Sequence, residues 1–140
     1  MKVQRDLQGR IVTEVFAPMI AILEEDARQA LTLIHYDPQG GSPRLFLSGE
    51  GLLGDTVELM LRLNTREKKL VVARIQLDRI RMGFGTRLLE AIRTYGKAEG
   101  YETLVFESVL TDRAKAFLRK HGFHPEYKGE NEVFDWVCPL

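Results

Sequence analysis

The chain has 140 residues, the size of one domain, so we predict a single domain over residues 1–140. Its 44% hydrophobic and 29% charged residues are typical of a globular protein and exclude a disordered one. Lysine plus arginine and aspartate plus glutamate both number 20, so no net charge favours nucleic acid or a membrane surface, and the single cysteine excludes a disulfide framework or a multi-cysteine zinc site.

The first half of the chain predicts one helix followed by strands. Residues 10–15 form a short β-prone run. From Pro18 onward, apolar residues recur at steps of three and four as far as Ile34, which predicts an amphipathic helix that ends before the loop at 37–43. Three strand-like runs follow, at residues 44–48, 56–63 and 70–77. The second alternates apolar and polar residues, and the third is apolar enough to lie in the centre of a sheet.

The second half predicts a loop, a helix and further strands after residue 77. An apolar stripe from Leu88 to Ala98 marks the helix, and Glu99-Gly100 ends it. Four further elements are a strand at 104–106, a short helix at 114–118, and two strands around Tyr127 and at 133–137. This order, an antiparallel meander followed by a βαβ unit, predicts an α/β (α+β) fold with a mixed, mostly antiparallel sheet, a central βαβ unit and helices on both faces.

The most informative segment is the loop Arg81-Met82-Gly83-Phe84-Gly85-Thr86, between a central strand and a helix. Its glycines let the backbone approach a ligand closely, and the first N–H groups of the helix lack internal partners, so the loop predicts a site for phosphate or pyrophosphate. Arg79, Arg81 and Arg87 add three cations. The alternative is a tight turn without a ligand. Leu88 excludes a dinucleotide fingerprint, and no Walker motif is present.

Two stretches resemble the motifs of the GNAT superfamily of N-acetyltransferases. Residues 75–89 resemble its acetyl-CoA-binding motif, a hydrophobic strand, a loop with arginine/glutamine-x-x-glycine-x-glycine/alanine, and an amphipathic helix. Residues 111–123 resemble its next motif, which has an asparagine, an alanine, an aromatic pair and glycine-phenylalanine. The resemblance covers about residues 70–137. It implies a GNAT-like domain with acetyl-CoA as cosubstrate and no metal.

The resemblance also implies which residues bind acetyl-CoA. Backbone groups of one strand would hold the acetyl and pantetheine part, the glycine loop would hold the pyrophosphate, and a residue before the next helix would contact the pantetheine arm. In that order these are Ala73, Arg74 and Ile75; Arg81, Met82, Gly83, Phe84, Gly85 and Thr86; and Thr111.

Three positions depart from the family pattern. Ile80 stands where the family has arginine or glutamine, and Thr111 stands where it has asparagine, or Asp112 does if the loop is one residue shorter. Leu118 stands where the family often has the tyrosine that protonates the departing thiolate. The first two departures concern cofactor contacts, and the third leaves the general acid unassigned.

Acetyl transfer to an amine needs a base, because a lysine-like amine has a pKa of about 10.4 and is protonated at neutral pH. Glu107 is the first candidate, because it interrupts an apolar strand just before the second motif, where desolvation would make it a stronger base. Glu58 is the fallback, on the polar side of its strand. For both, the alternative is a carboxylate that faces water. His35 and His124 are further candidates for the base, but at the ends of their elements we expect surface histidines.

The resemblance implies an N-acetyltransferase in which an unidentified amine attacks acetyl-CoA directly. The acceptor is either a small-molecule amine or a protein or peptide amine. Two alternatives are a CoA-binding or regulatory module without catalysis, and an oligomeric partner protein that uses the apolar face of residues 16–23. The assembly that we consider for this protein is a homodimer. Since no leader sequence is recognisable and the 16–23 stretch is too short for a membrane span, we expect a cytoplasmic protein.

Overall fold

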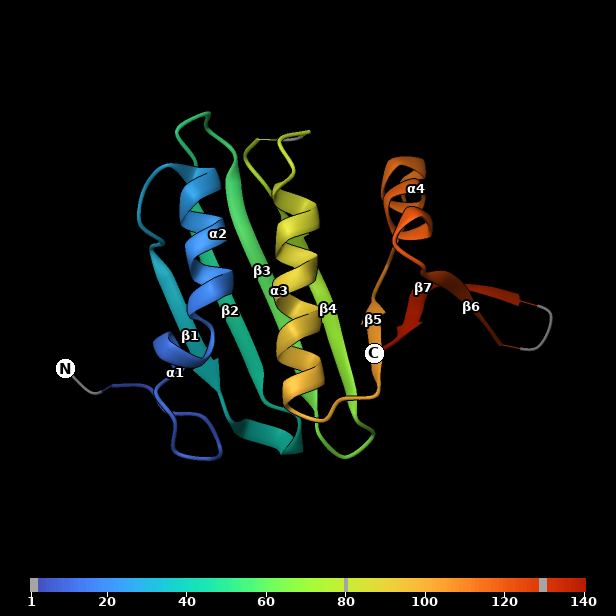
Figure 1. The fold of residues 1–140 in the computed structure, drawn as a ribbon, viewed down its shortest axis with the longest axis horizontal. Coiled ribbons are helices and arrows are strands. Elements are labelled where there is room, and N and C mark those ends of the chain that lie inside the picture. The colour runs from blue at the N-terminus through green and yellow to red at the C-terminus, as the bar shows by residue number, and fades with distance from the viewer. Residues whose placement is uncertain (1–2, 80, 129–130) are drawn as a thin grey trace.

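The computed structural model describes residues 3–79, 81–128 and 131–140. Its seven-stranded sheet has the order β1-β2-β3-β4-β5-β7-β6 (Figure 1). The strands are β1 (Leu33–Asp37), β2 (Arg44–Glu50), β3 (Thr56–Asn64), β4 (Lys69–Gln76), β5 (Thr103–Phe106), β6 (His124–Lys128) and β7 (Asn131–Pro139). β4 and β5 are parallel, and the other neighbouring pairs are antiparallel. The predicted class, the mostly antiparallel sheet and the central βαβ unit are therefore confirmed.

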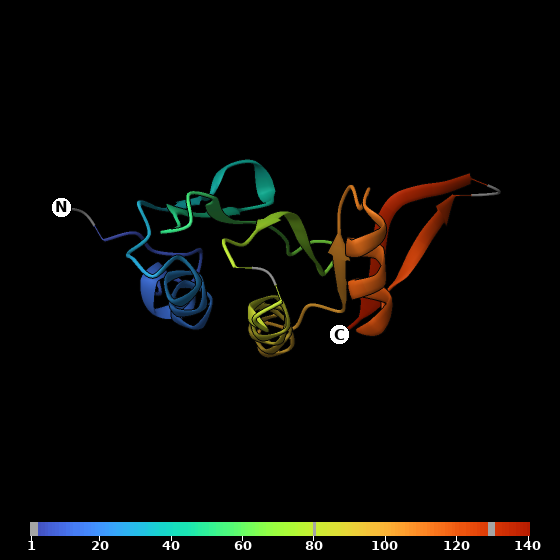
Figure 2. The ribbon, with the colours of Figure 1, turned by 90° about the horizontal axis from the view of Figure 1, so that it is seen from above.

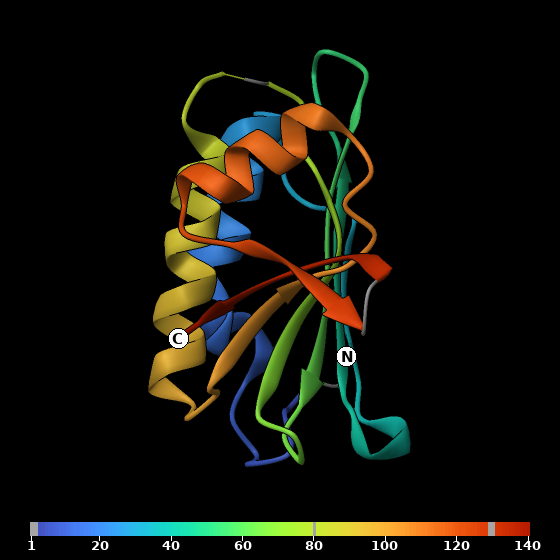
Figure 3. The ribbon, with the colours of Figure 1, turned by 90° about the vertical axis from the view of Figure 1, so that its right-hand side faces the viewer.

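The helices are α1 (Val12–Val15), α2 (Ala17–Ala27), the short 3-10 helix η1 (Gln39–Gly41), α3 (Phe84–Ala98) and α4 (Asp112–Lys120). α2 and α3 lie side by side against the same face of β2, β3 and β4 (Figures 1 and 2). α4 lies beyond the upper ends of β5 and β7 (Figure 3). None of the described helices is long and apolar enough to cross a membrane.

The strand β3 shows why one face of the sheet carries the helices. Its alternate residues Val57, Leu59, Leu61 and Leu63 are buried and belong to one hydrophobic core with residues of α2 and α3. The residues between them, such as Glu58 and Arg62, are half-buried on the opposite face. The predicted helices on both faces are therefore not seen along β2, β3 and β4 in the described part of the chain, where the opposite face carries half-buried polar side chains together with Phe46 and Met60.

The N-terminal elements differ from the prediction in two places. The β-prone run at 10–15 is helical, as α1, apart from an isolated bridge between Arg5 and Ile11. The helix predicted to reach Ile34 ends at Ala27, because Arg28 adopts a left-handed conformation with φ of 60° and its N–H donates to the Glu24 carbonyl. Residues 33–37 form β1 instead. Leu31 and Ile34 fit a helical spacing, but they pack on the core from an extended chain.

The free edge of β1 is covered by a side chain. The Gln4 amide nitrogen donates to the Ile34 carbonyl at 2.5 Å, and the Tyr36 N–H donates to the Gln4 amide oxygen at 2.7 Å. One primary amide thus pairs with two backbone groups of β1. The residues before α1 are fixed against the sheet in this way.

Candidate functional site

The start of α3 presents unpaired backbone donors. Gly83 precedes the helix with φ of 81°, a conformation that favours glycine, and no side chain caps this end. The first hydrogen bond here runs from the Arg87 N–H to the Gly83 carbonyl at 3.1 Å. The N–H groups of Phe84, Gly85 and Thr86 therefore lie before the helical ladder, and no described residue accepts from them. Together with the helix dipole they suit an anionic group.

The three arginines near this loop are not equivalent. The Arg79 guanidinium donates to the carbonyls of Glu25 and Asp26 at the end of α2, at 2.6 and 3.1 Å. Arg87 donates to the Glu25 carboxylate at 2.7 Å, and this hydrogen bond lowers the pKa of Glu25. Arg81 is exposed and forms no ion pair with any described residue. Arg81 is thus the cation that remains available to a ligand.

Beside this loop, β4 has an open backbone edge. The parallel pairing of β4 with β5 ends at Val72 and Phe106, followed by one bond from the Glu107 N–H to the Val72 carbonyl at 3.0 Å. Ala73 is an extra residue in the pairing with β3, since Leu61 lies opposite Val72 and Met60 lies opposite Arg74. From Ala73 to Ile75 the strand pairs with β3 alone among the described strands. Backbone groups on its other edge are therefore free to bind an extended, amide-containing ligand.

The helix α4 closes this region from the third side. Thr111 is its N-cap, and its hydroxyl oxygen accepts from the Ala114 N–H at 3.1 Å while its own hydrogen stays available as a donor. The Thr86 hydroxyl lies 3.4 Å from the His121 ring nitrogen, and a Cβ on Gly85 would lie 3.5 Å from the Phe117 ring. Thr111 and the glycine loop are therefore on elements that pack together.

Position 118 offers no proton donor to this region. The Leu118 side chain is 2% exposed and belongs to the hydrophobic core. Nearby, His121 has a lowered pKa, because partial burial and the Arg93 guanidinium both disfavour its charged form. The helix α4, Asp112–Lys120, contains no tyrosine.

The two candidate bases lie on the sheet face opposite α2 and α3, and each is paired with an arginine. Glu107 accepts from Arg62 of β3 in a short ion pair, and Glu58 accepts from Arg74 of β4 at 3.1 Å. Glu107 follows the last strand pair, so it lies where β4 and β5 separate. It lines a pocket of about 350 Å³ together with residues from both arms of the sheet, Arg62, Asn64, Glu67, Lys69, Val71, Val105, Glu126 and Asp135. Most of these lining residues are charged or polar, so Glu107 does not have the mainly apolar surroundings that its sequence neighbours predicted.

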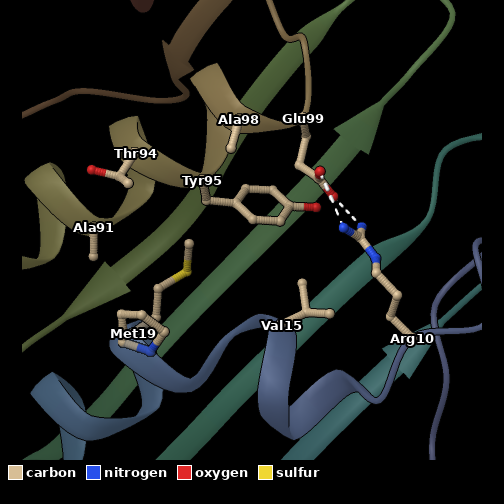
Figure 4. Close-up of a pocket in the computed structure, with 9 residues that line it drawn as sticks. Arg10, Val15, Met19, Ala91, Thr94, Tyr95, Ala98 and Glu99 are labelled. Carbon is tan, nitrogen blue, oxygen red and sulfur yellow. Dashed lines mark hydrogen bonds and ion pairs between the residues drawn. The ribbon is translucent and has the colours of Figure 1, made fainter.

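A second pocket lies at the other end of α3. It has a volume of about 340 Å³ and lies between the start of α2 and the last turns of α3. None of the predicted site residues lines it. Arg10 donates to Glu99 across its rim, and the Tyr95 ring points toward this ion pair (Figure 4). Burial raises the pKa of Tyr95, so its hydroxyl stays neutral. The charged groups here are paired with one another.

Sequence reasoning missed three residues that shape the site, Asp26, Asp78 and Arg62. Asp26 and Asp78 are buried and bind backbone N–H groups at the start of the glycine loop and in the β2–β3 turn, and Arg62 pairs with Glu107. Asp26 and Asp78 are 52 residues apart, and Arg62 and Glu107 are 45 apart. Asp26 follows Glu24 and Glu25 in the sequence, so nothing local distinguished it from a solvent-facing acidic residue.

No protein-family model matches the chain, and no curated protein matches it in sequence. Solved structures do match. A GNAT-family acetyltransferase from Staphylococcus aureus Mu50 has a TM-score of 0.55 at 11% identity, with 91% of this chain and 92% of that chain covered. An acetyltransferase from Thermus thermophilus has a TM-score of 0.52 at 22% identity, with 73% and 66% covered.

The PaiA N-acetyltransferase of Thermoplasma acidophilum, solved in complex with coenzyme A, has a TM-score of 0.53 at 18% identity. The match covers 69% of this chain and 61% of that one, so this chain spans less than two thirds of that relative. At these identities the likeness concerns the fold. With the parallel β4–α3–β5 unit and the separation of β4 from β5, it leads to one conclusion: the chain has the fold of the GNAT acetyltransferases.

Proposed function

We propose that this protein is an acyl-CoA-dependent N-acetyltransferase that acts on a small-molecule, protein or peptide amine. One observation carries the proposal: the unpaired N–H groups at the start of α3 lie next to the open edge of β4 in a GNAT fold. Coenzyme A has two parts that match these features, an anionic pyrophosphate and a pantetheine arm with two amides. The pyrophosphate alone accounts for the unpaired N–H groups of the loop.

The chain's own residues then divide into two groups. Phe84, Gly85 and Thr86 donate backbone N–H groups to the pyrophosphate, and Arg81 adds a charge. The edge from Ala73 to Ile75 pairs with the amides of the pantetheine arm, as a neighbouring strand would. The Thr111 hydroxyl donates to the same arm. Acetyl-CoA supplies an acyl thioester: the amine nitrogen bonds to its carbonyl carbon, the C–S bond breaks, and CoA leaves as a thiolate.

The amine must lose a proton, and we assign this step to Glu107, directly or through a water. The position of Glu107 where β4 and β5 separate supports the assignment, as does Arg62, which fixes the direction of the carboxylate. Glu58 is the second candidate, held by Arg74. The thiolate needs no dedicated acid, because an ordinary thiol titrates near ~8.5 and the proton taken from the amine is available.

Two measurements on the wild-type protein test this proposal. Saturating CoA, at ~100 times its Kd, should stabilise the fold by about 2.7 kcal/mol and raise the melting temperature. Thiol release from acetyl-CoA should then depend on an added amine, found by screening a panel that includes diamines, amino sugars and lysine peptides. No melting shift at millimolar CoA would contradict the proposal.

A second function, CoA binding without catalysis, has its own support. Leu118 is a core residue in place of a phenol, and both candidate bases are held in ion pairs. A CoA-induced melting shift without thiol release for any amine in the panel would favour this function. Thiol release with a single amine would exclude it.

A further inference from the structure

Two buried carboxylates meet where the glycine loop leaves β4. Asp26, at the end of α2, is fully buried, and Asp78, two residues past β4, is 5% exposed; they are the buried charged residues of the described chain. The Asp26 carboxylate accepts from the N–H groups of Asp78 at 2.6 Å and Arg79 at 2.8 Å. Asp78 and Arg79, which lie between β4 and the glycine loop, are therefore attached to α2 through their backbone.

Asp78 in turn attaches the loop to the turn between β2 and β3. Its two carboxylate oxygens accept from the N–H groups of Leu53 at 3.1 Å and Asp55 at 3.2 Å. A Cβ on Gly51 would overlap the Asp78 carboxyl group, so position 51 must be glycine for the Asp78 carboxylate to pack against the β2–β3 turn. Three segments meet at this junction, the end of α2, the β2–β3 turn and the start of the loop.

The junction extends to the first turn of α3 through Arg79. Its side chain donates to the last carbonyls of α2, and its guanidinium lies 4.8 Å from the ring centre of Phe84, the first residue of α3. The Arg79 Nε also lies 3.7 Å from the Asp26 carboxylate. A buried carboxylate that loses its donors is destabilising, so the segment at 78–79 cannot easily move away from Asp26, nor the β2–β3 turn away from Asp78. Arg79 therefore connects the end of α2 with the first residue of α3.

We propose that Asp26 and Asp78 are positioning residues that hold the unpaired N–H groups of α3 in place for the pyrophosphate of CoA. The proposal rests on the proposed function. Neither side chain touches the ligand, since both carboxylates already accept hydrogen bonds from backbone N–H groups. Their effect is to keep the loop ordered before the ligand arrives, which lowers the entropy cost of binding.

The test compares CoA with pantetheine, which has the same amide arm but lacks the pyrophosphate and the nucleotide. Asp26→Asn keeps the volume but turns an amide N–H toward a backbone N–H, so CoA binding should weaken by about ten-fold. Asp78→Asn should weaken it by a smaller factor, about three-fold, because Asp26 still holds the loop. Pantetheine binding should stay unchanged in both variants, as measured by calorimetric titration.

Glu24→Gln is the matched control. Glu24 lies on the same helix and accepts from the Leu31 N–H at 2.9 Å, away from the loop. It should lower the melting temperature without changing the ratio of CoA affinity to pantetheine affinity. A merely structural role for Asp26 would likewise lower the melting temperature and leave that ratio unchanged.

The outcomes separate this proposal from the proposed function. If the wild type binds no CoA, the proposed function fails and the positioning role fails with it. If the wild type binds CoA and the ratio is unchanged in Asp26→Asn, only the positioning role is overturned. If Asp26→Asn does not fold, Asp78→Asn decides by the same ratio. Failure of both variants to fold would overturn the proposal, since the carboxylates would then be required for the fold itself.

Discussion

The loop before α3 and the carboxylates on the opposite sheet face are built in different ways. The loop offers N–H groups from one continuous stretch, Phe84 to Thr86, for which no described residue is an acceptor. The opposite face offers side chains from separate strands, and these are already paired, Glu107 with Arg62 and Glu58 with Arg74. The N–H groups of the loop are therefore available to an anionic ligand, whereas each carboxylate is already paired with an arginine before any substrate binds. Binding and chemistry can thus be lost separately.

The largest effect should come from Glu107→Gln. A positioned base contributes about 10²–10⁴-fold, so kcat/KM should fall by that factor while CoA affinity changes little. Steady-state kinetics at several pH values and titration with CoA measure both quantities.

The control for that variant is Glu102→Gln, just before β5 as Glu107 is just after it, where an exposed carboxylate lies 3.4 Å from Lys68. It should leave kcat/KM unchanged. Near wild-type rates for Glu107→Gln across about pH 6 to 9 would make Glu107 structural and would move the assignment to Glu58.

The next effect concerns binding without chemistry. In Gly83→Val the side chain would have to adopt φ of 81°, which displaces the N–H groups of the first turn, so the CoA-induced melting shift should vanish. Gly100→Val is a close match at the other end of α3, because Gly100 also has φ of 81° and open space around its Cβ position. It should destabilise the fold similarly and keep the shift. Loss of the shift in both variants would refute a special role for Gly83.

A smaller effect should follow from Thr111→Val. Loss of one hydrogen bond to the pantetheine arm should weaken CoA binding by about 0.5–1.5 kcal/mol. Loss of the N-cap should also lower stability by roughly 0.5–2 kcal/mol, so Thr111→Ser, which keeps both hydrogen bonds, is the control. If Asp112→Ala weakens CoA binding and Thr111→Val does not, the alignment with the family motif is off by one residue.

The smallest effect should come from Glu25→Gln, which frees Arg87. The Arg87 hydrogen bond lowers the pKa of Glu25 below its usual 4.5, so this pair stabilises the folded state above that pH, and its contribution is lost as pH falls through the lowered pKa. The melting temperatures of wild type and variant should therefore differ slightly at neutral pH and converge in acid. CoA affinity should rise slightly at low ionic strength, because Arg87 becomes available. Weaker CoA binding would show that the ion pair itself orders the loop.

The loop could be predicted because its information is local. Glycines at 83 and 85, a preceding apolar strand and a following amphipathic helix are all contiguous in the chain. The central βαβ unit follows for the same reason, whereas the position of β7 between β5 and β6 was not predicted. The boundary between α2 and β1 could not be predicted, because Arg28 takes a left-handed conformation that its residue type does not favour.

The surroundings of the carboxylates could not be predicted, because they depend on pairings between distant strands. Glu107 was expected in an apolar setting from its neighbours in sequence, but Arg62 reaches it across β4. Asp26 is a similar case, since its donors lie on a loop that becomes its neighbour only after the sheet has formed. The apolar run around Glu107 therefore signals a distant partner without saying which, whereas Asp26, next to Glu24 and Glu25, gives no such signal.

The Gln4 amide at the border of β1 has a consequence for self-association. Bare outer strands attract copies of the same chain, since their free N–H and C=O groups can extend the sheet from one molecule into the next. At β1 the groups of Ile34 and Tyr36 are already engaged by Gln4. A second molecule must remove this glutamine before it can dock a strand there, so this border resists fibre-like stacking without a proline, a bulge or a lysine.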